Sequence, residues 1–147
     1  QTRLLIERLN GTSIGSMADL IVKHKHLIIR AETGKTPTDP KWLHSWLVNL
    51  VSEIKMDICQ GPITAYVDVP GNKGLTGVVI IETSHIAVHI WDEVNPGLLQ
   101  MDVYSCADFD PQQIFDKINE AFEPVKLEYK FLDREKSLTT IESKNKQ

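Results

Sequence analysis

The sequence has little of what marks several large classes of protein. Only two of its 147 residues are cysteines, Cys59 and Cys106, which is too few for the disulfide framework of a small secreted domain. No apolar run approaches the roughly 20 residues of a membrane-spanning helix, and no signal-peptide core is visible. Acidic residues outnumber basic ones by 20 to 16, whereas nucleic-acid-binding proteins usually carry a basic face. We therefore expect a cytoplasmic protein that binds neither nucleic acid nor a membrane.

The sequence also lacks the common cofactor motifs. It contains no glycine-rich phosphate-binding loop, no zinc quartet and no repeat of short period. His24 and His26 share one face of a predicted strand, but no carboxylate or cysteine is spaced to complete the three or four ligands that zinc requires. We therefore predict no metal site and interpret both histidines as strand-surface residues.

Composition and length predict one folded domain. A hydrophobic fraction of 41% with 24% charged residues is ordinary for a globular domain. Residues 1–16 are predicted to be a leader or an added tag, because Gly15-Ser16-Met17 resembles a junction before a natural start. The alternative is a short helix over residues 3–9 that packs against a neighbouring subunit. We expect the domain to span residues 17–135, and the polar tail 136–147 to be loosely ordered.

Two helices and six strands are predicted from residue periodicity. Asp39-Pro40 and Asp110-Pro111 each place a capping residue before a proline, which is typical of a helix start. Apolar residues then recur at intervals of three and four to about Met56 and about Phe122. Alternating and β-branched runs predict the strands, over residues 21–31, 63–69, 75–81, 85–91, 98–106 and 125–132.

The order strand, helix, four strands, helix, strand predicts an α+β fold. Short links between successive strands favour a mainly antiparallel sheet, and the two helices are expected on one face of it, as a two-layer sandwich. Two helices are too few to cover both faces of about six strands. We therefore predict a homodimer that forms through the exposed face or an edge of the sheet.

The most distinctive stretch runs from Gly77 to Trp91. Two β-type runs flank the polar break Glu82-Thr83-Ser84-His85, so a hydroxyl and an imidazole lie at a joint between strands. The period of two places His85 and His89 on one face of the second run. A later alternating strand ends in Cys106.

This stretch resembles the pyruvoyl-dependent S-adenosylmethionine decarboxylases of the short prokaryotic type. The family pattern is an apolar strand after a glycine, then Glu-Ser-His, a second histidine four residues later, Trp-Pro-Glu, and an Asp-Val-Phe/Tyr-Thr-Cys strand. The resemblance extends from about Lys23 to about Glu135. The matching residues are Gly77 to Ile81, Ser84-His85, His89, Trp91-Asp92-Glu93 and Asp102 to Cys106.

Three positions differ from the family pattern. Thr83 stands directly before the serine, where the family usually has Glu, and Glu82 lies one position earlier. Asp92 replaces the usual proline. The family hydroxyl that is expected before Gly77 is present as Thr76.

The resemblance implies a chemistry for these residues. Losing CO2 from an α-amino acid leaves a carbanion that no ordinary side chain can delocalise, so an electron sink is required. By resemblance, that sink is a pyruvoyl group made from Ser84, whose ketone takes the amine of the small-molecule substrate as a Schiff base. Ser84 would attack the carbonyl of Thr83, and the chain would be cleaved between them with assistance from His89. The remaining implied residues are the proton donor Cys106 and the substrate-binding residues Glu93 and Thr76.

Three functions remain open at this stage. The first is decarboxylation of S-adenosylmethionine for polyamine synthesis, and the second is decarboxylation of another amino acid, such as arginine or ornithine, on the same fold. The third is a non-processing, non-catalytic homologue that binds a nucleoside-like ligand. Thr83 favours the third, because a β-branched residue restricts the backbone differently from Glu and removes a carboxylate beside the reacting bond.

Overall fold

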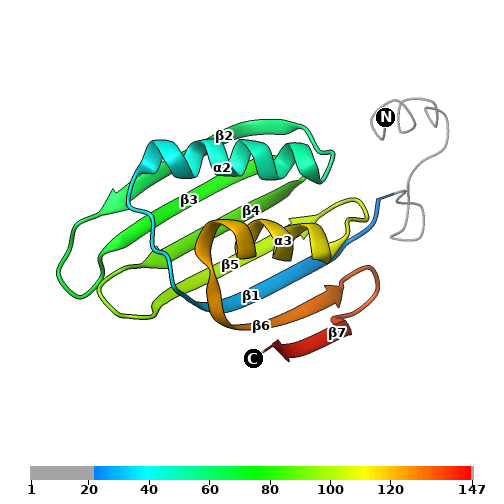
Figure 1. Ribbon diagram of the computed structural model, residues 1–147. Helices are drawn as coiled ribbons and strands as arrows, with labels where there is room; N and C mark the ends of the chain where they lie inside the picture. The colour runs from blue at the N-terminus through cyan, green and yellow to red at the C-terminus, as the bar shows by residue number, and fades with distance from the viewer. Residues whose placement is uncertain (1–21, 147) are drawn as a thin grey trace.

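The protein is described by a computed structural model that covers residues 22–146 (Figure 1). Its helices are α2 (Pro40–Glu53) and α3 (Pro111–Phe122). The predicted leader or tag and the alternative helix over residues 3–9 lie outside the described residues. The strands are β1 (Lys25–Thr33), β2 (Ile58–Val67), β3 (Gly74–Ile81), β4 (Ser84–Trp91), β5 (Gly97–Ser105), β6 (Pro124–Asp133) and β7 (Thr139–Lys146).

One seven-stranded sheet and two helices form the two layers of the molecule (Figure 1). The strand order is β2-β3-β4-β5-β1-β6-β7, and every neighbouring pair is antiparallel. Both helices lie on the same face of the sheet (Figure 1). The predicted α+β two-layer sandwich with an antiparallel sheet is therefore confirmed.

Both helices begin where the sequence predicts. The side chain of Asp39 accepts a hydrogen bond from the Lys41 N–H, and that of Asp110 accepts one from the Gln112 N–H, each at 2.9 Å. These bonds satisfy N–H groups that have no partner within the first helical turn. Among the described residues, neither helix has the length and apolar character needed to cross a bilayer.

The core lies between the helices and one face of the sheet. Helix α2 packs against β2 and β3, and α3 packs against β6. Each central strand contributes every second residue, as the period of a strand requires. The helices contribute Leu43, Trp46, Leu47, Leu50, Val51, Ile114, Phe115, Ile118 and Phe122, all of them buried.

The sheet differs from its prediction at three places. Strand β1 spans Lys25–Thr33, later in the chain than the expected 21–31. Strand β2 begins at Ile58, ahead of the expected start at residue 63. Residues 139–146, expected to be loosely ordered, form the edge strand β7, which pairs with β6. The Tyr129 hydroxyl donates to Glu142, and burial together with this carboxylate raises the pKa of Tyr129 to about 12. Ladder hydrogen bonds explain a strand in so polar a sequence, because they need no apolar side chains.

The face of the sheet opposite the helices, here called the open face, carries exposed apolar side chains. Ile63 is 70% exposed, and its direct partner Val78 is 41% exposed. Ile80 and Ile28 lie on the same face and are 44% and 42% exposed. Exposed apolar side chains that gather on one face often mark a surface that meets another protein. This arrangement is what the predicted homodimer would need.

Gly74, at the start of β3, is a position that we predict cannot accept a side chain. An added Cβ atom would lie 1.8 Å from the Ile90 carbonyl oxygen, and the paired backbone cannot move aside without losing ladder hydrogen bonds. We expect Gly74→Ala to lower the free energy of unfolding by about 3 kcal/mol or more.

Gly71→Ala is the matched control for this substitution. A Cβ atom at Gly71 meets nothing within 4 Å, so only the positive φ of 84° opposes it, at a cost of about 1 kcal/mol. Urea unfolding of the two variants measures both losses. Equal losses would contradict the close contact at Gly74.

Candidate active site

Strands β3 and β4 are joined by a two-residue turn, Glu82-Thr83, with Ile81 paired to Ser84. Glu82 has a φ of 53°, in the left-handed region. Both turn residues are exposed, whereas Ser84 is only 5% exposed. The joint predicted from the sequence is therefore a tight hairpin, and the peptide bond between Thr83 and Ser84 lies where the chain enters β4.

Three side chains meet at this turn. Ser84 Oγ accepts a hydrogen bond from the backbone N–H of Cys106 at 2.7 Å. The Cys106 thiol in turn donates to Glu82 Oε2 at 3.7 Å. Ser84 begins β4 and Cys106 follows the end of β5, so the antiparallel pairing of these strands brings the two residues together. The sequence pattern did not reveal the contact of Glu82, because spacing does not show which turn side chain faces the thiol.

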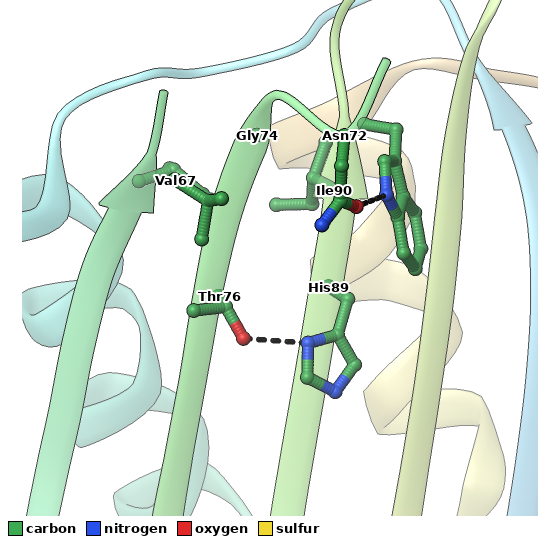
Figure 2. Close-up of a pocket in the computed structure, with 8 residues that line it drawn as sticks. Val67, Asn72, Gly74, Thr76, His89 and Ile90 are labelled. Carbon is green, nitrogen blue, oxygen red and sulfur yellow. Dashed lines mark hydrogen bonds between the residues drawn. The ribbon is translucent and has the colours of Figure 1, made fainter. Parts of the chain in front are cut away.

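Thr76 and His89 lie on the open face, toward the other end of β4. They are direct partners across β3 and β4, and Thr76 Oγ1 is 2.5 Å from His89 Nδ1. The pair lines a hollow of about 170 Å³, together with Asn72 and Trp91. Figure 2 shows the Thr76–His89 contact on the neighbouring strands β3 and β4. Trp91 Nε1 donates to Asn72 Oδ1 at 2.8 Å, which holds the indole ring near His89.

Within one chain, Ser84 and His89 do not meet. Ser84 belongs to the buried side of β4, with Ile86 and Val88, whereas His85 and His89 project from the open face. The five-residue interval adds a separation of about 17 Å along the strand. The assistance from His89 that the resemblance implies therefore cannot come from the same chain, because even and odd strand positions face opposite ways.

Glu93 lies in the loop that follows β4. Its carboxylate accepts hydrogen bonds from the N–H groups of Gly71 at 3.1 Å and Lys73 at 3.2 Å. These two bonds lower the pKa of Glu93 below its ordinary value, so the carboxylate is charged at neutral pH. Together with Trp91, Glu93 lines a second hollow of about 480 Å³. A charged acceptor and an aromatic ring are thus held at one site.

The open face also carries a hydrogen-bonded network that the sequence patterns did not predict. Asp102 Oδ2 accepts from His26 Nε2 at 2.8 Å and from His85 Nε2 at 2.6 Å. Alternation along each strand was a signal that these residues share a face. The strand order that places β1 and β4 on either side of β5 could not be seen in the sequence. His26 is therefore an anchored residue and not an isolated surface histidine.

The tautomer of His26 decides how this network is interpreted. His26, His85 and Asp102 bring potential metal-ligand atoms within 4.8 Å of one another. The Arg134 guanidinium, however, donates to His26 Nδ1 at 3.2 Å, which assigns the proton of the neutral ring to Nε2, facing Asp102. A metal ion would need Nε2 without its proton. We therefore interpret the cluster as a hydrogen-bonded support for Asp102.

We predict that Asp102→Asn lowers stability by about 1–2 kcal/mol at neutral pH, because the amide lacks the charge to which both imidazoles bind. Burial alone would raise the pKa of Asp102, but the bonds from His26 and His85 outweigh it and lower the pKa below its usual value. A lowered pKa stabilises the fold above the unfolded pKa of about 4, and this contribution disappears as the pH falls through the folded value.

Urea unfolding between neutral pH and about pH 2.5 tests this titration. The wild type should lose more stability on acidification than Asp102→Asn, so that the two curves converge in acid. The exposed residue Asp57 provides the control, and Asp57→Asn should keep the wild-type curve. Parallel curves for the wild type and Asp102→Asn would contradict the assigned role of Asp102.

The sequence was compared with known families and curated proteins. A family model described as S-adenosylmethionine decarboxylase matches residues 25–135. A relative named S-adenosylmethionine decarboxylase proenzyme, from Pyrobaculum islandicum, is 44% identical over 64 residues, which is 43% of this chain and 50% of the relative. One with the same name from Archaeoglobus fulgidus is 36% identical over 62 residues, or 42% of this chain and 54% of the relative.

This chain thus spans about half the length of the curated relatives that it matches. The match to the family model is longer. It includes both strands of the hairpin, the residues on the open face and the thiol beside the turn. Because that match covers well over half of the sequence, the chain belongs to the S-adenosylmethionine decarboxylase family.

Proposed function

We propose that this protein decarboxylates S-adenosylmethionine with a pyruvoyl group derived from its own Ser84. The observation that supports this function best is the contact between Ser84 and Cys106 at the β3–β4 turn. A hydroxyl beside a turn peptide bond and an adjacent thiol are the groups that self-processing and substrate protonation require. The relatives are named proenzymes, which fits a chain that becomes active after cleavage.

Self-processing would begin at the bond between Thr83 and Ser84. Ser84 Oγ attacks the Thr83 carbonyl carbon, the amide nitrogen leaves as an amine, and an ester joins the two residues. Loss of the Ser84 α-proton then breaks the ester, and hydrolysis releases the nitrogen of Ser84 as ammonia. The Cys106 N–H orients the attacking oxygen, and the left-handed backbone of Glu82 strains the turn that precedes the bond.

Cys106 would donate the proton to the substrate carbon. A pyruvoyl group, once formed, supplies the electron sink that decarboxylation requires. The Cys106 N–H contacts Ser84 Oγ, and its thiol contacts Glu82, two residues before Ser84. The thiol must remain reduced for this role. Both cysteines are free, and we place the activity in the cytoplasm, where thiols are kept reduced.

His89 would act on the Ser84 of a second copy. It lies on the open face, away from the Ser84 of its own chain, and it is exposed and oriented by Thr76. The exposed apolar side chains of the same face favour association with another molecule of this chain. A homodimer would then combine the Ser84 and Cys106 of one chain with the Thr76 and His89 of the other.

The hollows around Trp91 are the proposed binding site for the nucleoside part of the substrate. The indole ring offers an apolar surface for stacking an adenine base. Glu93 offers a charged acceptor for ribose hydroxyls, and its two backbone hydrogen bonds fix its position. In the proposed dimer, Trp91 and Glu93 follow His89 toward the Ser84 of the other chain. The substrate would thus lie between the two copies.

Processing is the first test of this function. We expect the mass of the intact protein to divide slowly into two fragments at the bond between Thr83 and Ser84. Ser84→Ala should abolish cleavage, because it removes the attacking oxygen. Thr83→Glu should accelerate it, because it restores the carboxylate that the family places beside the reacting bond. The measurement is the cleaved fraction against time for all three proteins.

The released CO2 identifies the substrate once cleavage is established. Carboxyl-labelled S-adenosylmethionine, arginine and ornithine are supplied separately to the cleaved protein. Turnover of S-adenosylmethionine alone supports the proposed function, whereas turnover of arginine or ornithine would assign the protein to another substrate. If neither the wild type nor Thr83→Glu cleaves or releases CO2, the decarboxylase proposal is wrong.

Mixing two inactive variants tests the arrangement across the dimer. Ser84→Ala and His89→Ala chains should each fail to cleave by themselves. After equal amounts are refolded together, mixed dimers join an intact Ser84 to an intact His89, so about half of the His89→Ala chains should be cleaved. Sedimentation of the mixture confirms whether dimers are present. Dimers without cleavage would show that His89 does not act across the interface.

A further inference from the structure

We propose that Asp92, anchored by Tyr66, is the positioning residue of the nucleoside site. Tyr66 fixes Asp92 to the sheet, and Asp92 keeps its two neighbours, Trp91 and Glu93, at a fixed spacing for the base and the ribose. The inference rests on the proposed function for the identity of the ligand. The bonds from which it is drawn belong to the uncleaved chain.

The Tyr66 side chain connects the core of the protein to the end of β4. Its ring is half-buried and packs against the core between the sheet and the helices. Its hydroxyl donates to Asp92 Oδ2 at 2.8 Å. Because β3 lies between β2 and β4 in the sheet, this bond reaches past the neighbouring strand. A packed ring thus presents a fixed donor to a residue that follows β4.

The loop between β2 and β3, residues 68–73, binds Asp92 and both of its neighbours. The Asp92 N–H donates to the Lys73 carbonyl oxygen at 3.2 Å. The indole N–H of Trp91 donates to a side chain of this loop, and the carboxylate of Glu93 accepts two of its backbone N–H groups. Three consecutive residues are therefore held by one loop. A displacement of Asp92 would move both of its neighbours.

Both hollows of the proposed nucleoside site lie where this loop meets residues 91–93. Asn72 lines the hollow of about 170 Å³, and Gly71 lines the hollow of about 480 Å³. Trp91 lines both of them. The bonds that join the loop to residues 91–93 therefore also fix the walls of the two hollows.

The residue type at position 92 explains why an anchor is needed. The family usually has a proline there, which fixes φ near −65°. Aspartate leaves φ free, and a loop that must be ordered on binding lowers the affinity for its ligand. Asp92 bonds through its carboxylate and its N–H, two groups that proline lacks. Hydrogen bonds thus replace a covalent restraint in this chain.

Amide hydrogen exchange, measured by mass spectrometry, tests the anchor in the uncleaved protein. Tyr66→Phe keeps the ring and removes only the hydroxyl, so we expect the N–H groups of residues 71–73 and 92–93 to exchange about fivefold faster. Asp92→Ala should give the same increase, and the double variant should add nothing to it. Asp92→Asn keeps an acceptor oxygen and should stay within about twofold of the wild type.

Tyr129→Phe is the matched control for the loss of a tyrosine hydroxyl. It removes the donor to Glu142 on β7, at the opposite edge of the sheet, and should leave the exchange of residues 71–73 and 92–93 unchanged. In Tyr66→Phe, exchange within β1 and β6 should keep the wild-type rate. An unchanged rate in the loop of Tyr66→Phe, or an equal rise along the whole chain, would overturn the proposal.

Nucleoside affinity tests what the anchor does for binding. The probe is 5′-deoxy-5′-methylthioadenosine, a thioether nucleoside without the reacting amino acid, and calorimetry gives its Kd. We expect the Kd to rise about fivefold in Tyr66→Phe and in Asp92→Ala, because the loop must then be ordered by the ligand. Asp92→Asn and Tyr129→Phe should remain close to the wild type. Faster exchange with an unchanged Kd would overturn the role of Asp92 in binding.

The outcomes separate this inference from the proposed function. If the wild type binds the nucleoside but neither cleaves nor releases CO2, the affinities of the variants still decide the role of Asp92, while the decarboxylase proposal fails. If the wild type releases CO2 and Tyr66→Phe keeps its Kd, only this inference is wrong. A wild type that does not bind the nucleoside overturns the nucleoside site and the role of Asp92 in it.

Steady-state kinetics extends the test to an active protein. Tyr66→Phe should raise the KM for S-adenosylmethionine about fivefold and leave kcat nearly unchanged, because the nucleoside part of the substrate does not react. A fall in kcat with an unchanged KM would contradict a role in nucleoside positioning.

Discussion

The two-residue period of β4 is the constraint on which the candidate site depends. It assigns Ser84 to the side of the sheet that the helices cover and His89 to the side that they leave open. A strand cannot place both side chains on one face without a bulge, and the pairing of β4 with β3 and β5 is regular over this stretch. Two residues that are close in the sequence are therefore separated in one chain.

The same constraint explains why the open face carries many polar and ionisable side chains. The helices bury one side of the sheet. Polar and charged side chains lie on the other side, including the Asp102 network and the Thr76–His89 pair. Exposed Ile63 and Val78 lie on the same face. A surface that combines apolar area with fixed polar groups suits an interface that also contains a substrate site.

The turn between β3 and β4 holds what is particular to this member of the family. The family's usual glutamate before the serine is replaced by Thr83, and a carboxylate stands one position earlier, on Glu82. A shift by one residue in a hairpin changes where a side chain points. Glu82 contacts the Cys106 thiol, so the carboxylate of this turn lies beside the thiol.

The sequence by itself determined the class of fold and most of its elements. Asp-Pro pairs marked both helix starts because a cap and a proline act through local backbone geometry. Alternation marked the central strands, since it follows from burial of one face. Local composition failed for β7, whose polar residues are ordered by pairing with β6 and not by burial. Helix α2 was likewise predicted a few residues too long at its end.

For the site, the sequence supplied candidates, and the tertiary structure decided which of them meet. The order of Ser84, His89 and Cys106 along the chain could not reveal that only the first and last are in contact, because that depends on strand register. The network of His26, His85 and Asp102 joins residues of β1, β4 and β5, so it required the strand order. Local backbone geometry depends on neighbouring residues in the sequence. Contacts between distant segments arise only when the sheet is assembled.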